Sequence, residues 1–140
     1  MVRIKNTQIG LRQYNSIFKL NQKLNIAISS YRSAPFGGGQ GIFIYELSKA
    51  LQSLGHIVDI ISGPPYPNLE PKINLIRSPG LNLFSTFVFK ERLKIFLNKK
   101  NKSLDDWFEF SSTLLGGFPE IRTFGNRLSY LLQNSSYDIL

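Results

Sequence analysis

The sequence contains no cysteine and a single histidine, His56. The lack of cysteine excludes disulfide scaffolds, thiolate zinc sites, iron–sulfur clusters and cysteine nucleophiles. One histidine excludes any multi-histidine metal site. No stretch approaches the roughly 18 consecutive apolar residues of a membrane-spanning helix. The longest candidate, residues 81–89, is interrupted by Asn82, Ser85 and Thr86.

Acidic residues are also scarce, because 9 Asp and Glu stand against 17 Lys and Arg. The excess lies in residues 1–23, which carry cations and no acid, and in residues 90–102, where Glu91 is the only acid. Charge runs are usually solvated surface, but either segment could also contact an anionic membrane or a nucleic acid. We interpret residues 1–23 as a basic N-terminal extension. Because they lack the apolar core of a secretory signal, we expect a cytoplasmic location.

What the sequence does contain is the pattern of an α/β domain. Residues 24–30 alternate apolar and polar side chains, which predicts a strand. Apolar residues then recur at helical spacing from Ile42, with Ile44, Leu47, Leu51 and Leu54 on one stripe, and Gly55 ends the helix. Residues 57–61 are almost all β-branched or aliphatic, as in a strand buried on both faces. This order predicts a right-handed βαβ unit that opens a parallel, Rossmann-like sheet with flanking helices.

The second half of the sequence is predicted to be mainly helical after a third strand at residues 73–76. Residues 83–100 read as one basic amphipathic helix, whose apolar face either packs into the core or lies on an anionic membrane. Its expected face consists of Phe84, Phe87, Val88, Glu91 and Ile95.

Two further helices and a strand complete the prediction. Residues 103–106 form a capping-box-like helix start with Asp in place of Glu. The expected inner face of that helix is Leu104, Trp107, Phe108, Ser111 and Leu115. Thr123 is predicted to cap the last helix, with Phe124, Leu128, Leu131 and Leu132 inside. Residues 137–140 resemble the start of another buried strand, so we expect the domain to be incomplete at this end.

The glycine cluster between the first strand and the first helix is the main candidate site. Ligands bind open parallel sheets at such a turn, where glycines permit close approach and the helix offers free N–H groups. The cluster is neither a dinucleotide fingerprint nor a P-loop, and a tight turn without ligand remains the alternative. The candidate donor- or acceptor-binding residues are Gly37, Gly38, Gly39, Gln40 and Gly41.

Other polar residues give weaker signals, and the sequence assigns no catalytic residue. His56 follows the helix-ending glycine, so we expect it to bond helix carbonyls or to face solvent. Asp105 and Glu109 lie four residues apart, which favours a solvated helix face over acid–base catalysis. The three residues that flank glycine-containing loops and could contact an acceptor are Arg32, Glu120 and Arg122.

Several motifs together carry a resemblance to a known family. They are LNIAISS at residues 24–30, PFGGGQGI at 35–42, ELSKAL at 46–51 and LGHIV at 54–58. In order and spacing they resemble the acceptor-side half of family 4 glycosyltransferases. The segments GPPYP at 63–67 and GGFPE at 116–120 resemble one branch of that family. The resemblance covers residues 24–140, and residues 1–23 lie outside it.

The resemblance implies a GT-B enzyme with two Rossmann-like halves, in which this chain is the N-terminal half. Such an enzyme transfers a sugar from a nucleotide-sugar co-substrate to an acceptor, with retention of configuration and without a metal or other cofactor. A donor-binding C-terminal half would be missing from these residues, so we expect the chain alone to be inactive. The alternative is a non-catalytic module that binds anionic lipid or nucleic acid. Because most aromatics sit on predicted inner faces, nucleic acid is not expected.

Overall fold

The computed structural model describes residues 22–35 and 38–140. Almost all of the predicted basic extension and one residue of the glycine cluster, Gly37, therefore lie outside the described residues.

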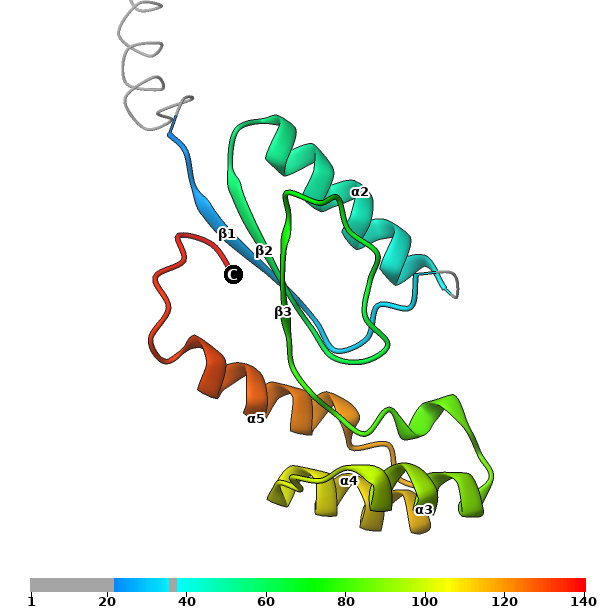
Figure 1. The fold of residues 1–140 in the computed structure, drawn as a ribbon. Helices are drawn as coiled ribbons and strands as arrows, with labels where there is room; N and C mark the ends of the chain where they lie inside the picture. Colours follow the sequence, from blue (N-terminus) through cyan, green and yellow to red (C-terminus); the bar gives the residue numbers. More distant parts are fainter. Residues whose placement is uncertain (1–21, 36–37) are drawn as a thin grey trace, which may run out of the picture.

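The core of the fold is a parallel sheet of three strands in the order β1-β2-β3 (Figure 1). The strands are β1 (Asn25–Ser30), β2 (Ile57–Ser62) and β3 (Asn74–Arg77). In the register, Ile28 pairs with Ile60 and Ile60 with Leu75. Helix α2 (Gly39–Ser53) makes the crossover from β1 to β2. The predicted βαβ unit and the Rossmann-like α/β class are therefore confirmed.

Strand β2 is buried on both faces, as its apolar sequence predicts. Ile60 is fully buried in a cluster with Ile44 of α2, Val58 and Ile73. Ile61 is 1% exposed, and because side chains alternate along a strand it projects from the opposite face of the sheet. Helix α2 therefore packs on one face of the sheet, and the opposite face, which carries Ile61, is also covered by other residues.

Part of the glycine cluster is helical, because α2 begins at Gly39 and not at Ile42 as the sequence predicts. Gly38 precedes the helix with φ 96°, a conformation that favours glycine. The helix ends at Ser53, so Leu54 is 73% exposed and its predicted place in the buried stripe was wrong. Gly55 has φ 92°, as expected for the residue that stops the helix.

Gly41 is required for packing. A Cβ atom added at Gly41 would lie 2.2 Å from the carbonyl oxygen of Ala34, whereas one at Gly39 meets nothing within 4 Å. We expect Gly41→Ala to lower the free energy of unfolding by about 1–3 kcal/mol, since α2 must move away from the 31–34 segment. Urea denaturation would measure this, with Gly39→Ala as the matched control. Equal stability of the two variants would contradict the close contact.

The predicted helix over residues 83–100 was wrong in its start and in its buried face. The structure has a short 3-10 helix, η1 (Leu83–Ser85), followed by extended residues and then α3 (Phe89–Asn98). Phe87 and Val88 are 71% and 55% exposed. Phe96 is buried instead, packing with Leu81 and Leu83 and stacking on Phe110 at 4.4 Å between ring centroids. The break at residues 86–88 changes which side of α3 faces the core.

Helix α4 (Leu104–Leu114) begins with the predicted capping box, in which Ser103 and Asp106 bond each other's backbone N–H groups. Its predicted apolar inner face was wrong, because Leu104 and Leu115 are 89% and 90% exposed. The buried side chains of α4 are Asp106, Glu109 and Thr113. Burial of the two carboxylates is possible because Lys99, directly after α3, and Arg127, farther along the chain, pair with them.

Helix α5 (Glu120–Leu132) begins four residues before its predicted start, because its N-cap is Pro119 and not Thr123. Thr123 therefore lies inside the first turn, fully buried, and does not cap the helix. Phe124 is buried as predicted. Leu131 is 38% exposed, so its expected place in the core was wrong.

The predicted strand at residues 137–140 is present as a single parallel bridge between Ile139 and Ile26. The N–H of Ala27 donates to the carbonyl of Ile139, on the edge of β1 opposite to β2. The Tyr137 hydroxyl donates to Asp59, and burial together with this bond raises the pKa of Tyr137 to about 12.

Among the described helices, none is long and apolar enough to cross a bilayer.

Candidate functional site

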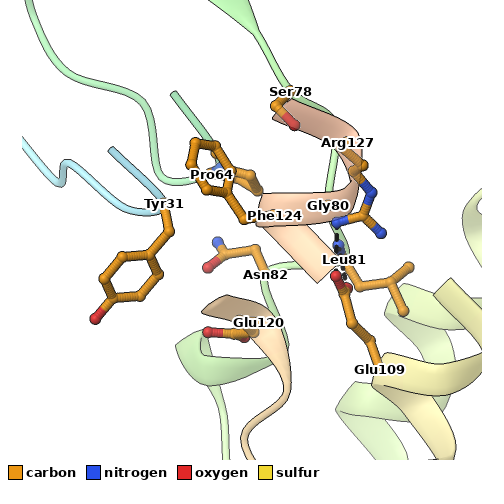
Figure 2. A pocket seen from close by; sticks show the side chains of 11 residues that line it. Tyr31, Pro64, Ser78, Gly80, Leu81, Asn82, Glu109, Glu120, Phe124 and Arg127 are labelled. Atoms are coloured by element: carbon orange, nitrogen blue, oxygen red, sulfur yellow. Dashed lines mark hydrogen bonds and ion pairs between the residues drawn. The ribbon is translucent and has the colours of Figure 1, made fainter. Parts of the chain in front are cut away.

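The carboxyl ends of the three parallel strands meet at one edge of the sheet, where open α/β folds bind their ligands. A cavity at this edge is lined by Tyr31 after β1, Gly63 after β2, Asn82 after β3 and Glu120 at the start of α5 (Figure 2). Its volume is about 20 Å³, which is room for about one water molecule. Any ligand larger than a water molecule would therefore lie over its mouth rather than inside it.

The start of α2 lies at the same edge, immediately after β1 and the 31–38 segment. Gly38, Gly39 and Gln40 are exposed, and the first turn of α2 contains no acidic residue. Among the described residues, no side chain caps these first N–H groups. The amides and the positive end of the helix dipole are thus open to an anion. Gly41, in contrast, is buried against Ala34 and is not part of this open surface.

Two of the three predicted acceptor contacts lie together. The guanidinium carbon of Arg32 lies 3.8 Å from the centre of the Phe84 ring, and the Phe84 N–H donates to Glu120 Oε1 at 3.3 Å. Burial raises the pKa of Glu120, an effect that the positive charge of Arg32 opposes. Arg122 lies apart from them, exposed over the ring of Phe108.

His56 has a structural partner that the sequence did not suggest. Its Nδ1 accepts the backbone N–H of Leu24 at 3.3 Å, so the side chain joins the end of α2 to the residue before β1. The expectation that His56 bonds a helix carbonyl is confirmed for its backbone N–H, which donates to the Leu51 carbonyl of α2 at 3.3 Å. Nothing in its surroundings favours a catalytic role.

Behind the cavity lies a buried charge network that the sequence analysis missed. Arg127 of α5 donates from Nη1 to Glu109 Oε1 at 2.6 Å and from Nη2 to Asp106 Oδ1 at 3.1 Å. Lys99 donates to the same oxygen of Asp106 at 2.7 Å. The prediction that Glu109 is solvated was therefore wrong. The partners come from α4, from α5 and from the residue that follows α3, so only the tertiary structure reveals the network.

The network keeps Asp106 ionised. Burial by itself would raise the pKa of Asp106, but hydrogen bonds from Lys99 and Ser103 outweigh it and hold the pKa below its ordinary value. A depressed carboxyl pKa stabilises the fold above the unfolded-state pKa. That contribution is lost as the pH falls through the folded-state pKa.

Glu109 connects the network to the cavity wall. Its Oε2 accepts the backbone N–H of Leu81 at 3.1 Å, and its Oε1 accepts the Thr123 hydroxyl at 2.6 Å. Through these bonds Glu109 fixes the segment after β3 and the first turn of α5, both of which line the cavity. Its role in the site is that of a positioning residue.

Comparison with known proteins adds evidence from sequence similarity. No family model matches the chain. The chain is similar in sequence to a glycosyltransferase. Over 120 residues it is 35% identical to an MMP alpha-(1->4)-mannosyltransferase of Mycolicibacterium hassiacum, a match that covers 84% of this chain. The chain spans 28% of the length of that relative. The similarity supports the resemblance to glycosyltransferases inferred from the sequence motifs.

Proposed function

We propose that this chain is the acceptor-side, N-terminal half of a nucleotide-sugar-dependent glycosyltransferase of the GT-B type. The proposal includes retention of anomeric configuration and no metal, as the family 4 resemblance implies. Its main support is the 35% identity to a mannosyltransferase over 84% of the chain. The open N-terminus of α2 at the carboxyl edge of a parallel sheet is consistent with it.

In this proposal the first turn of α2 faces the donor diphosphate. Free N–H groups at residues 39 and 40 and the helix dipole stabilise negative charge. This charge grows on the leaving nucleoside diphosphate as the bond to the sugar breaks. Hydrogen-bond donors that the fold already holds in position stabilise this charge in the transition state, because they do not have to reorient during the reaction. The glycines at 38 and 39 leave the approach clear of side chains.

The acceptor lies over the mouth of the cavity, between Tyr31, Arg32 and Glu120. The Glu120 carboxylate can accept a hydrogen bond from a sugar hydroxyl, and the Arg32 guanidinium can donate one. Because Glu120 is half-buried beside Arg32, its orientation is fixed before a ligand arrives. These residues act as binding groups, and the proton acceptor for the attacking hydroxyl is not among the residues assigned.

The donor site requires a second wall. A charged diphosphate is bound tightly when cations and hydrogen-bond donors converge on it from both sides and exclude water. We therefore expect the 140-residue chain alone to show no sugar transfer and no tight binding of nucleoside diphosphates or their sugars. Calorimetric titration would check this. A micromolar dissociation constant, about 8 kcal/mol of binding, would contradict the division of the site between two halves.

Transfer itself is tested with a donor-binding half present, either as further chain or as a separate polypeptide. Nucleoside diphosphate mannose and glucose would be offered with saccharide acceptors, and the product anomer read by nuclear magnetic resonance. We expect mannosyl transfer with retention. A folded protein with both halves that transfers no sugar from any donor would contradict the proposal.

Contact with an anionic membrane is a second candidate function, favoured by the surface around α3. Phe87, Val88, Phe89 and Leu97 are each more than half exposed. Lys90, Lys94 and Lys100 are exposed nearby and form no ion pair with any described residue. Exposed apolar side chains flanked by lysines are typical of a helix at a lipid surface.

We expect the variant with Lys90, Lys94 and Lys100 changed to Gln to bind anionic vesicles more weakly, by about 1 kcal/mol per lysine. Added salt should weaken binding of the parent chain in the same way. Vesicle co-sedimentation would measure both, with the exposed Lys72→Gln as the single-charge control. Lys99 is left unchanged because it pairs with Asp106. Salt-independent binding, or none by the parent chain, would contradict this second function.

A further inference from the structure

A second hollow lies beside the cavity and is not used in the proposed reaction. It is a groove of about 470 Å³ between the segment after β3, the start of α4 and the outer part of α5. Ser78 and Arg127 line both the groove and the cavity, so the two share a wall. The volume falls in the range of sites for small organic ligands.

The groove carries planar polar groups beside an exposed aromatic ring. Asp105 Oδ1 accepts a hydrogen bond from the amide of Asn126 at 3.0 Å, which joins α4 to α5 across the groove. The other carboxylate oxygen, the amide carbonyl of Asn126 and the whole amide of Asn101 make no hydrogen bond with any described residue. Tyr130, which is 76% exposed, supplies a ring at the same groove.

The charges in the groove favour a neutral ligand. Lys99 and Arg127 pair with the two buried carboxylates Asp106 and Glu109, so their positive charge is already compensated. Asp105 remains as a carboxylate without an ion pair among the described residues, and it would repel a phosphate. Amides and a carboxylate bind hydroxyl groups well, and a flat ring covers the C–H face of a sugar. This combination fits a saccharide.

We propose that the groove is a subsite for a further sugar residue of a saccharide acceptor. The inference rests on the proposed function, because it places the reacting end of the acceptor over the cavity. Arg127 lines both hollows, so a saccharide that starts there would extend along the surface beside Arg127 into the groove. The relative is named an α-(1→4)-mannosyltransferase, and such a linkage joins one sugar to oxygen 4 of another. A sugar acceptor is therefore consistent with the similarity.

The groove lies wholly within the described chain, so the test uses the 140-residue protein and needs no nucleotide. Calorimetry would compare mannose with α-(1→4)-linked mannotetraose, and amide shifts would map the contacts. We expect the tetraose to bind at least tenfold more tightly than mannose and to shift the amides of Asn101, Asp105, Asn126 and Tyr130. Tyr130→Ala and Asn126→Ala should each weaken tetraose binding about tenfold.

The control is Phe43→Ala, which removes an exposed aromatic ring from α2, outside the groove. It should leave tetraose binding unchanged. Equal binding of mannose and tetraose, no binding by the folded protein, or an equal loss in Phe43→Ala and Tyr130→Ala would overturn the inference. Failure of sugar transfer with both halves present would instead contradict the proposed function, so the two failures are distinguishable.

Discussion

Replacing Arg127 by Met is expected to destabilise the chain by about 3–5 kcal/mol, measured as the free energy of unfolding in urea. The substitution keeps a long apolar stem but removes the cation between Glu109 and Asp106. Lys99 still neutralises Asp106, so the loss falls mainly on the buried Glu109. A buried charge without a partner costs much more than the pair contributes.

The matched control is Arg122→Met on the same helix. Arg122 is exposed and lies over the Phe108 ring, so its loss should change stability by less than about 0.5 kcal/mol. Adding Glu109→Gln to Arg127→Met should restore part of the stability, because the uncompensated charge is then gone. Additive losses in the double variant would show that Arg127 and Glu109 do not act as a pair.

Placing an aspartate at the start of α2, Gly39→Asp, is expected to lower sugar transfer by about 100-fold in the protein with both halves. The new carboxylate competes for the N–H groups proposed to face the diphosphate and repels it, and loss of such donors costs about this much. The same charge at a helix N-terminus should stabilise the fold by about 0.3–1 kcal/mol. Opposite changes in activity and stability distinguish a site defect from misfolding.

Gly39→Asn is the matched control, because it has almost the same size and no charge. A Cβ at this position meets nothing within 4 Å, so both variants should fold. We expect the Asn variant to keep much more activity than the Asp variant. Equal activities of the two variants would show that the charge at this end of α2 does not matter, and would count against a donor diphosphate there.

The sequence predicted well those elements that have one dominant local signal. The alternating residues of β1, the β-branched run of β2 and the stop at Gly55 were all placed within a residue or two. The capping box at Ser103 was also predicted, because its bonds join residues only three positions apart. Such signals depend only on residues close together in the sequence, so they can be recognised without knowledge of tertiary contacts.

The error at α4 has a clear physical cause. For α4 the sequence analysis assigned the apolar residues to the inner face, yet Leu104 is exposed and Asp106 is buried. The reason is that Asp106 pairs with Lys99, which directly follows α3, and with Arg127 of α5. A carboxylate looks like a surface residue until the cations that neutralise it are placed beside it.

The sequence by itself therefore determined the parallel α/β sheet, the glycine-rich turn before α2 and the resemblance to glycosyltransferases. It also indicated Arg32 and Glu120 as candidate acceptor contacts because they flank glycine-containing loops, and that assignment stays a prediction. Only the tertiary structure decided that Gly41 serves packing, that Glu109 holds the cavity wall, and that a groove lies beyond Arg127. These features depend on contacts between residues far apart in the chain. Hydrophobic periodicity reports which face of an element is apolar, but not which charged groups will meet across it.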